Sequence, residues 1–179
     1  MRLKFKMKIF IAGPRAIKTL NSNVKKRIEN IINQNFNIIV GDANGVDKQV
    51  QQFCFEHQYT SVTVFASNGK ARNNVGGWEV NNVEVDPTVK GFDFYVVKDL
   101  AMVKSADYGF MIWNGKSKGT LNNIYNLVKL NKKVLVYLTI TKEFYVIKSL
   151  EEIELLKSEP LFLNKSVNKE PDFEQIKLF

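Results

Sequence analysis

Five short runs that are mainly apolar along their whole length constrain the fold of this chain most strongly. They are IFIAG at 9–13, FNIIVG at 36–41, SVTVFAS at 61–67, GFMIW at 109–113 and KVLVYL at 133–138. A strand with one face in water alternates apolar and polar residues, whereas a strand covered on both faces is apolar throughout. The runs therefore predict the buried strands of a sheet that has helices on both faces.

Segments with helical periodicity lie between these runs. Apolar residues recur three or four positions apart within 24–35, 46–58, 92–106 and 121–132. In the third of these segments, the apolar stripe comprises Val96, Val97, Leu100 and Val103. Strands that alternate with amphipathic helices form parallel sheets with right-handed crossovers. The sequence thus predicts an α/β fold: a Rossmann-like, doubly wound, mainly parallel sheet of five or more strands.

The pattern changes after Leu138 and predicts a C-terminal extension. Residues 139–150 are suited to a hairpin partner for the last strand. Ser149 and Glu152 have the spacing of a capping box, which predicts that a further helix begins there. We therefore expect the sheet to be completed by a hairpin and a helix.

The order of these elements predicts a single Rossmann-like domain over residues 1–158. The stretch 68–92 has no clear periodicity and is long for a plain connection, so we expect an irregular insertion or lid there. Residues 159–179, broken by two prolines, are expected to form a C-terminal tail.

Composition limits the classes of protein to consider. The single cysteine, Cys54, excludes an internal disulfide, and no apolar run approaches the ~20 residues that span a membrane. We therefore expect a cytoplasmic protein with no membrane partner. The net charge is +8; the first 133 residues carry +10 and the last 46 carry −2. Because the lysines are mostly scattered singly, a solvated basic surface is favoured over a polyanion-binding patch.

Three predicted strands end in loops of small residues, at 12–15, 41–47 and 114–120. In open α/β sheets, ligands bind beyond the carboxyl ends of the strands, and parallel strands bring such loops to one edge. Glycine lets the backbone approach a ligand, and each following helix directs free N–H groups and a positive dipole end at the same edge. The arrangement predicts an anion-binding site.

Some residues of these loops have structural explanations as well. Asp47 falls in the first turn of a predicted helix, where the dipole favours a carboxylate, and Asp42 or Asn44 is suited to the N-cap. Arg15 fits a surface cation as well as a ligand contact. In the third loop, lysines, hydroxyls and backbone donors occur together, which favours anion binding. The predicted ligand-binding residues are Gly13, Arg15, Gly41, Asp42, Gly45, Gly115, Lys116, Ser117, Gly119, Thr120 and Asn123.

The same loops resemble those of a known family. IFIAGPR, GDANGVD and SADYGFMIWNGKSKGT are similar in order and spacing to motifs of the SLOG superfamily, over about residues 7–138. This Rossmann-like group includes the DNA-processing protein DprA and the LOG phosphoribohydrolases. Gly119 and Thr120 match the end of the family's P-G-G-x-G-T loop, whereas Asp42 and Asn44 replace a glycine and an arginine of its G-G-A-R-G-x-D loop. The resemblance implies binding of a nucleotide or nucleotide derivative, with its phosphate on the third loop.

The chain departs from the LOG enzymes at one position. Their loop motif continues to a glutamate that takes part in cleaving the N-glycosidic bond, and the corresponding residue here is Asn123. An amide neither takes up a proton nor acts as a nucleophile near neutral pH. Asp99 is the best alternative acid, since KIFIAGP and KDLAMVKSAD also resemble nucleoside 2-deoxyribosyltransferases. Its structural alternative is a solvated carboxylate paired with a lysine.

The insertion carries a further group of candidates. Arg72, Asn73 and Trp78 are suited to a lid, in which Trp78 stacks on a base and Arg72 reaches a phosphate. The structural alternative is a small hairpin, because WEVNNVEV alternates apolar and polar residues. With one histidine in the chain, a histidine-based metal site has little support, and we expect neither a metal nor a cofactor.

Three functions remain open at this point. The first is binding of a small phosphorylated nucleotide-like ligand, with no reaction assigned. The second is an N-glycoside hydrolase or transferase that acts on a nucleoside monophosphate and uses Asp99. The third is single-stranded nucleic-acid binding, as in DprA, which the absence of an interleaved aromatic and basic surface makes the least favoured. The resemblance also implies a homodimer.

Overall fold

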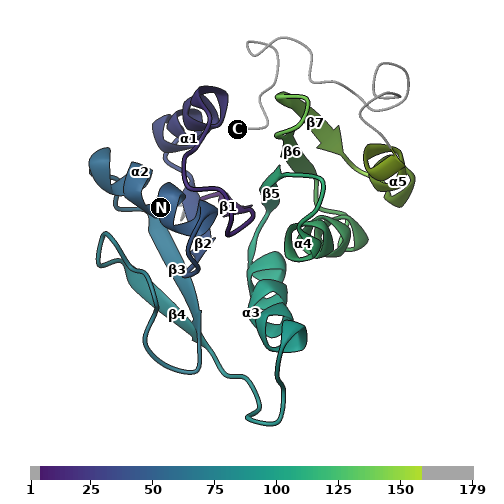
Figure 1. Ribbon diagram of the computed structural model, residues 1–179. Coiled ribbons are helices and arrows are strands. Elements are labelled where there is room, and N and C mark those ends of the chain that lie inside the picture. The colour runs from purple at the N-terminus through teal and green to yellow at the C-terminus, as the bar shows by residue number, and fades with distance from the viewer. Residues whose placement is uncertain (1–4, 159–179) are drawn as a thin grey trace.

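The computed structural model describes residues 5–158, and the predicted tail at 159–179 lies outside the described residues. Helices and strands alternate along most of the chain (Figure 1). In chain order the elements are β1 (Lys8–Ala12), α1 (Ser22–Asn33), β2 (Asn37–Gly41), α2 (Val46–Glu56), β3 (Val62–Ser67), β4 (Glu79–Val83), α3 (Phe92–Ser105), β5 (Tyr108–Trp113), α4 (Lys118–Lys129), β6 (Val134–Leu138), β7 (Glu143–Ile147) and α5 (Leu150–Ser158).

The strands form one seven-stranded sheet in the order β4-β3-β2-β1-β5-β6-β7. All neighbouring pairs are parallel except β6 and β7, which are antiparallel. The predicted Rossmann-like fold, with its C-terminal hairpin, is therefore confirmed. Because β1 pairs with both β2 and β5, the chain winds outward from β1 in one direction and later resumes from β5 in the other.

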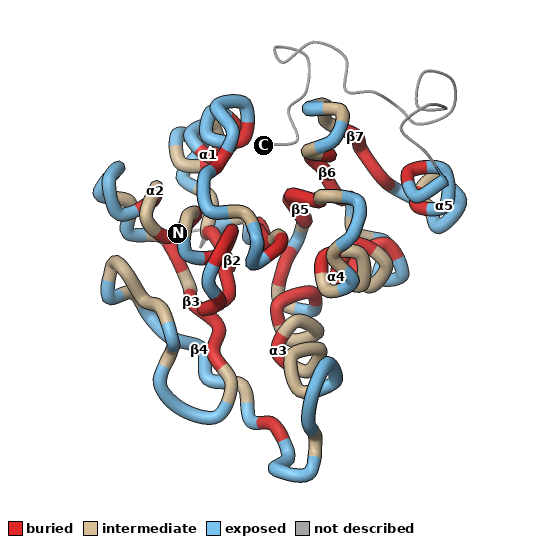
Figure 2. The backbone as a smooth tube through the Cα atoms, viewed as in Figure 1, coloured by how far each residue is buried: buried red, intermediate tan, exposed pale blue. Residues whose placement is uncertain are grey.

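Helices cover both faces of the sheet, as the apolar runs predicted. On one face, α1 and α2 pack over residues such as Ile9, Ile11 and Val40, and on the other α3, α4 and α5 pack over Phe10 and Met111. Successive residues of a strand point to opposite faces, so a strand with two covers must be apolar at every position. Figure 2 shows the result, buried central strands between largely exposed outer helix surfaces, with β4 exposed at the edge of the sheet.

The extension after β6 follows the sequence prediction closely. Ser149 Oγ accepts the backbone N–H of Glu152 at 3.2 Å, which is the N-cap half of a capping box at the start of α5. The Glu152 carboxylate accepts the N–H of Lys148 at 2.6 Å, one residue before the N-cap. In residues 5–158, no helix is both long and apolar enough to cross a membrane.

Two local expectations differ from the structure. The WEVNNVEV segment forms no hairpin of its own; β4 adds to β3 as a parallel edge strand. The predicted apolar stripe of α3 is also only partly buried, because Lys98 and Met102 are buried together with Val103, whereas Val96 is half-buried. The reason is that α3 turns a polar face toward a cavity at the sheet edge, described next.

Candidate functional site

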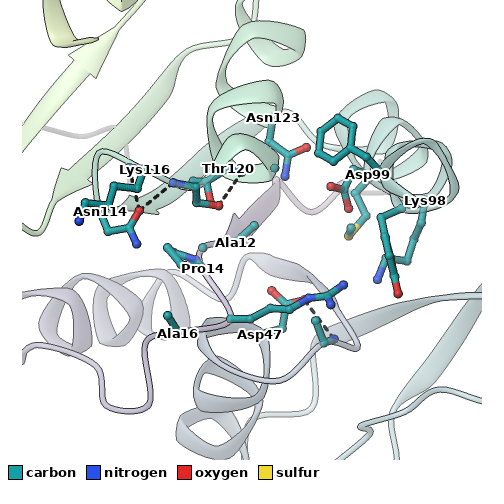
Figure 3. Close-up of a pocket in the computed structure, with 18 residues that line it drawn as sticks. Ala12, Pro14, Ala16, Asp47, Lys98, Asp99, Asn114, Lys116, Thr120 and Asn123 are labelled. Carbon is teal, nitrogen blue, oxygen red and sulfur yellow. Dashed lines mark hydrogen bonds between the residues drawn. The ribbon is translucent and has the colours of Figure 1, made fainter. Parts of the chain in front are cut away.

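A cavity of about 580 Å³ lies beyond the carboxyl ends of β1 and β5, and we call it the switch-point pocket. These two strands mark the position where the winding of the sheet reverses, which is where doubly wound folds bind ligands. Its wall comes from the loop after β1, the α2 start, one side of α3 and the loop into α4 (Figure 3). The lining residues are Ala12, Gly13, Pro14, Arg15, Ala16, Ala43, Asp47, Phe92, Tyr95, Lys98, Asp99, Met102, Asn114, Lys116, Ser117, Gly119, Thr120 and Asn123.

The start of α4 forms the anion-accepting side of the pocket. Ser117 is the N-cap, and its Oγ accepts the N–H of Thr120 at 3.3 Å and the Thr120 hydroxyl at 3.0 Å. Asn114 Oδ1 accepts the N–H groups of Lys116 and Ser117 at 3.0 and 2.9 Å, which holds the loop in shape. The first-turn N–H of Gly119 has no intrahelical acceptor, and a Cβ built on Gly119 would meet no atom within 4 Å. A ligand can therefore approach this backbone closely.

Asn123 lies one helical turn beyond Thr120, on the same side of α4. It is 3% exposed, and its Oδ1 has no hydrogen-bond partner among the described residues. Leaving a buried polar atom unpaired costs roughly 1–3 kcal/mol, so such an atom in a pocket wall calls for an explanation. A ligand that donates a hydrogen bond to Asn123 would remove this cost.

One face of α3 forms the opposite wall. Tyr95, Lys98, Asp99 and Met102 follow the i, i+3, i+4, i+7 spacing that puts side chains on one side of a helix. The exposed ring of Phe92, one turn earlier, stands at the rim. Apart from Asp99, sequence reasoning missed this face. The sequence contains this spacing, but the stripe of Val96, Val97, Leu100 and Val103 on the same helix is more apolar and predicts a different buried face.

Two carboxyl groups reach the pocket from different elements. Asp47, at the start of α2, and Asp99, on α3, both line it (Figure 3). Burial raises the pKa of Asp47 to about 7, against the attraction of Lys98, and the nearby Asp99 adds to the rise. Burial likewise raises the pKa of Asp99 to about 6, against Lys98 and a hydrogen bond from Asn123. Asp99 is half-buried in the pocket wall and accepts a hydrogen bond from Asn123, so it is not the freely solvated carboxylate of the structural alternative.

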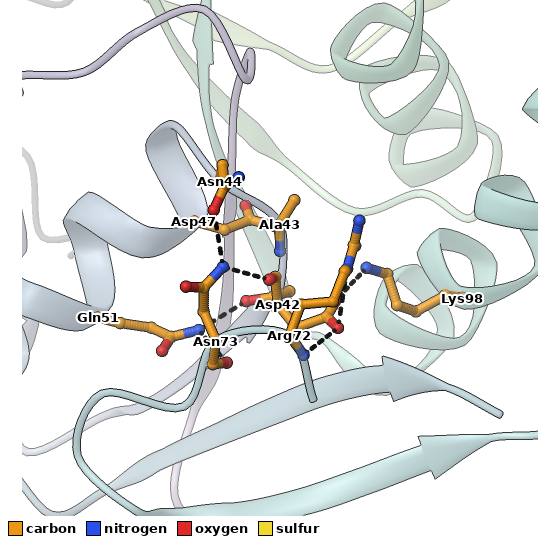
Figure 4. Close-up of polar contacts among 9 residues, drawn as sticks. Asp42, Ala43, Asn44, Asp47, Gln51, Arg72, Asn73 and Lys98 are labelled. Carbon is orange, nitrogen blue, oxygen red and sulfur yellow. Dashed lines mark hydrogen bonds and ion pairs between the residues drawn. The ribbon is translucent and has the colours of Figure 1, made fainter. Parts of the chain in front are cut away.

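Behind the pocket, Asp42 is the centre of a buried ion-pair network (Figure 4). Its Oδ1 accepts Lys98 Nζ at 2.7 Å and Arg72 Nη2 at 2.8 Å. Its Oδ2 accepts the backbone N–H and Nε of Arg72 at 3.0 and 3.1 Å. Burial alone would raise the pKa of Asp42, but the hydrogen bonds from Arg72 and Lys98 outweigh it and hold the pKa well below its usual range. Asp42 therefore positions Lys98 and does not itself line the pocket.

The three predicted lid residues are bound to the body of the protein and do not line the pocket. Asn73 Nδ2 donates to the carbonyl of Asp42 at 2.8 Å, and Trp78 Nε1 donates to the carbonyl of Tyr59 at 2.9 Å. Arg72 comes nearest, since its guanidinium lies 5.7 Å from the ring centre of Tyr95. Their role as a lid stays a prediction.

The predicted glycines divide into two groups. Gly13 and Gly119 line the pocket, whereas Gly41, Gly45 and Gly115 lie outside its lining and bring loops together. A Cβ on Gly41 would lie 2.4 Å from Asp47 Oδ2. Gly45 adopts φ +80, and a Cβ there would lie 2.4 Å from Cα of Arg15. Small residues thus let the second loop pack directly on the first and on Asp47.

The pocket therefore brings together eight of the predicted site residues from three separate parts of the chain. They are Gly13, Arg15, Asp99, Lys116, Ser117, Gly119, Thr120 and Asn123. The guanidinium of Arg15 stacks on Tyr95 at 4.5 Å from the ring centre, which fixes this cation at the pocket mouth. Within residues 5–158, no group of three or more histidine, cysteine, aspartate or glutamate side chains is arranged to hold a metal ion.

Comparison with known proteins supports the fold. No protein-family model matches the sequence, and no curated protein matches it. The structure is similar to DNA processing protein A from Helicobacter pylori, with a TM-score of 0.54 and 14% sequence identity. That protein is described for its single-stranded DNA binding mode. The match covers 73% of this chain and 64% of that one, so more than a third of the other protein has no counterpart in the match. The predicted resemblance to DprA is thus confirmed at the level of the fold.

Proposed function

We propose that this protein binds a phosphorylated nucleoside in the switch-point pocket, with the phosphate at the start of α4. The convergence of two loops and two helices around a cavity at the β1–β5 junction carries the proposal. A phosphate there meets the positive end of the α4 dipole, the free N–H of Gly119 and the Thr120 hydroxyl. Lys116 adds a cation beside the α4 start, and Arg15, stacked on Tyr95 across the pocket, adds a second cation at its mouth.

The remaining walls suit the rest of a nucleoside. Asp47, Asp99 and the unpaired Oδ1 of Asn123 are acceptors for sugar hydroxyls or base N–H groups. The rings of Phe92 and Tyr95 offer flat apolar surface for a base. The α4 start with Lys116 on one side and the acceptors and rings on the other match a ligand with an anionic end and a neutral, hydrogen-bonding end.

Thermal shift measurements with a panel of mono- and dinucleotides test this proposal. We expect micromolar binding, and a ligand at 100 times its Kd stabilises by about 2.7 kcal/mol, which raises the Tm of a protein of this size by roughly 5–11 °C. Gly119→Ala and Thr120→Val should abolish most of the shift. Since a Cβ at Gly119 meets open space, Gly119→Ala should leave the Tm of the free protein unchanged.

Thr60→Val, at an exposed position outside the pocket, is the matched control and should respond to ligand like the wild type. If no member of the panel shifts the Tm, the proposal is wrong. Unchanged affinity in both Gly119→Ala and Thr120→Val would equally remove α4 as the phosphate site.

A second candidate is N-glycoside cleavage in the same pocket, and the raised pKa values of Asp47 and Asp99 favour it. Carboxyl groups with pKa values of about 7 and 6 exchange protons near neutral pH, as a general acid and a general base must. In this reaction water forms a bond to C1′ of the sugar, the C1′–N bond breaks and a proton goes to the departing base. Release of free base from nucleoside monophosphates, abolished by Asp99→Asn, would establish it. Release that survives Asp99→Asn would exclude Asp99 as the acid.

Single-stranded DNA binding is the third candidate, favoured by the fold likeness and by the charges of the loops at the carboxyl edge of the sheet. These loops carry the exposed basic residues Arg15, Lys18, Lys70, Arg72, Lys116, Lys118 and Lys142. Because basic side chains that neutralise DNA phosphates release counterions, DNA binding should weaken steeply as the salt concentration rises. A fluorescent oligonucleotide that shows no binding at 50 mM salt would exclude this function.

A further inference from the structure

A second cavity, of about 320 Å³, opens at the carboxyl edge next to the switch-point pocket. It lies between the segment that leads into α1, the ends of β5 and β6, and the turn that connects β6 to β7. Leu20, Val24 and Ile112 give it apolar walls, and Thr139 and Lys142 are partly or fully exposed parts of its lining. Its size is at the lower end of the range for small-molecule sites.

Tyr137 lines this cavity and has a buried hydroxyl without a partner among the described residues. The residue is 1% exposed, and its OH has no hydrogen-bond partner within residues 5–158. Burial raises the pKa of Tyr137, so the phenol stays protonated and is a donor at neutral pH. The ring packs against Phe144 at 5.0 Å between ring centres, which fixes its position. The cavity thus combines apolar walls with one buried donor that lacks an acceptor.

The two cavities are bounded by neighbouring residues of the same loops. Ala16 lines the switch-point pocket, and the next residue, Ile17, lines the second cavity. On the other side, the backbone N–H of Thr139 donates to the carbonyl of Trp113 at 2.9 Å, which joins the two loops that bound the cavities. The two cavities are therefore close enough in the fold to be considered as parts of one extended site.

We propose that the second cavity holds a planar heteroaromatic ring, so that the two cavities together bind a dinucleotide; this inference rests on the proposed nucleotide-binding function. A nucleobase has apolar faces for Leu20, Val24 and Ile112 and ring acceptors at its edge for the Tyr137 hydroxyl. An aliphatic group would leave that hydroxyl unpaired, and a charged group would be buried among apolar side chains at a large cost. Lys142 at the exposed side suits the phosphates that link the two nucleosides.

Calorimetric titration with AMP and with diadenosine diphosphate, two adenosines joined through a pyrophosphate, tests the inference. We expect diadenosine diphosphate to bind roughly tenfold more tightly than AMP, because a second ring is buried. Tyr137→Phe removes one neutral hydrogen bond and should weaken dinucleotide binding about 2- to 12-fold, with AMP binding unchanged. Lys142→Glu, at an exposed position, should also weaken only the dinucleotide. Lys48→Glu, exposed on α2 outside both cavities, is the control.

The outcomes separate this inference from the function it rests on. If AMP binds but diadenosine diphosphate binds no more tightly, or if Tyr137→Phe weakens both equally, the second cavity is not a base site and the nucleotide pocket stands. If neither ligand binds, both proposals are wrong. In the free protein, Tyr137→Phe should leave the Tm unchanged or raise it. A clear fall would mean that the hydroxyl is already paired with water, and the premise would be lost.

Discussion

Replacing Asp42 with asparagine tests the buried network that positions the α3 wall of the pocket. Asp42 accepts hydrogen bonds from Lys98 Nζ at 2.7 Å and from three N–H groups of Arg72 at 2.8–3.1 Å. An asparagine keeps one acceptor oxygen but turns an NH₂ group toward two cations. The Arg72 side chain is 44% exposed and can turn to water, whereas that of Lys98 is 4% exposed and cannot. The loss should therefore arise mainly at Lys98.

The magnitude follows from the burial of that lysine. Removing one partner of a buried ion pair leaves an uncompensated charge and costs about 3–5 kcal/mol. For a chain of this size, each 1 kcal/mol corresponds to about 2–4 °C in Tm, so we expect Asp42→Asn to lower the Tm by roughly 6–20 °C. The double variant with Lys98→Met should recover part of this loss, because no charge is then left buried beside the asparagine.

Thermal melts followed by circular dichroism, together with urea unfolding, measure these changes. Glu84→Gln, at an exposed position, is the control and should stay within about 0.5 kcal/mol of the wild type. Since the folded pKa of Asp42 lies below its unfolded value of about 4, its contribution is complete above pH 4 and is lost as the pH falls. The difference between wild type and variant should therefore shrink on acidification. A loss below about 1 kcal/mol at pH 7, or no recovery with Lys98→Met, would refute the reasoning.

Three further predictions concern residues of β2 and α2. Asp47→Asn should stabilise the protein at pH 8 and have no effect near pH 4. Because the folded pKa of Asp47 is about 7, its ionisation lowers the stability of the folded protein by an amount that grows as the pH rises from about 4 to 7. Equal stability changes at both pH values would contradict this. Gly41→Ala should destabilise by about 1–3 kcal/mol in urea unfolding, since its Cβ would lie 2.4 Å from Asp47 Oδ2; a neutral result would mean that Asp47 moves freely. Cys54 is fully buried with its pKa raised to about 12, so Ellman's reagent should react with it only after unfolding in guanidinium; fast reaction in the native protein would be inconsistent with the packing of α2.

The candidate site was partly predictable, and α4 and α3 show why. The loop into α4 is a continuous stretch in which glycine, lysine and hydroxyl residues occur side by side, so Gly119 and Thr120 could be selected without knowing their neighbours. The wall on α3 is different. Tyr95 and Lys98 become pocket residues only because α3 packs beside α4 and β1, and nothing in their local sequence distinguishes them from surface residues.

Asp42 illustrates a second limit. From the chain alone it was equally suited to a helix cap and to a ligand contact, and the structure instead pairs it with Lys98, 56 residues away. The lid residues Arg72 and Asn73 likewise bind Asp42 across about 30 residues. Ion pairs of this kind produce no periodic pattern in the sequence, because each partner comes from a different element.

Local patterns along the chain were sufficient to predict every strand except β4, the helices, their parallel winding and the sheet edge at which the small-residue loops meet. Apolar runs and the 3.6-residue helical repeat involve residues that are near neighbours in the chain, so they can be recognised directly in the sequence. Which charges meet in the pocket, which carboxyl groups are desolvated and that a second cavity adjoins the first were decided by packing. Electrostatic coupling and cavity shape depend on distances between elements remote in the chain, and these exist only once the sheet and its helices have assembled.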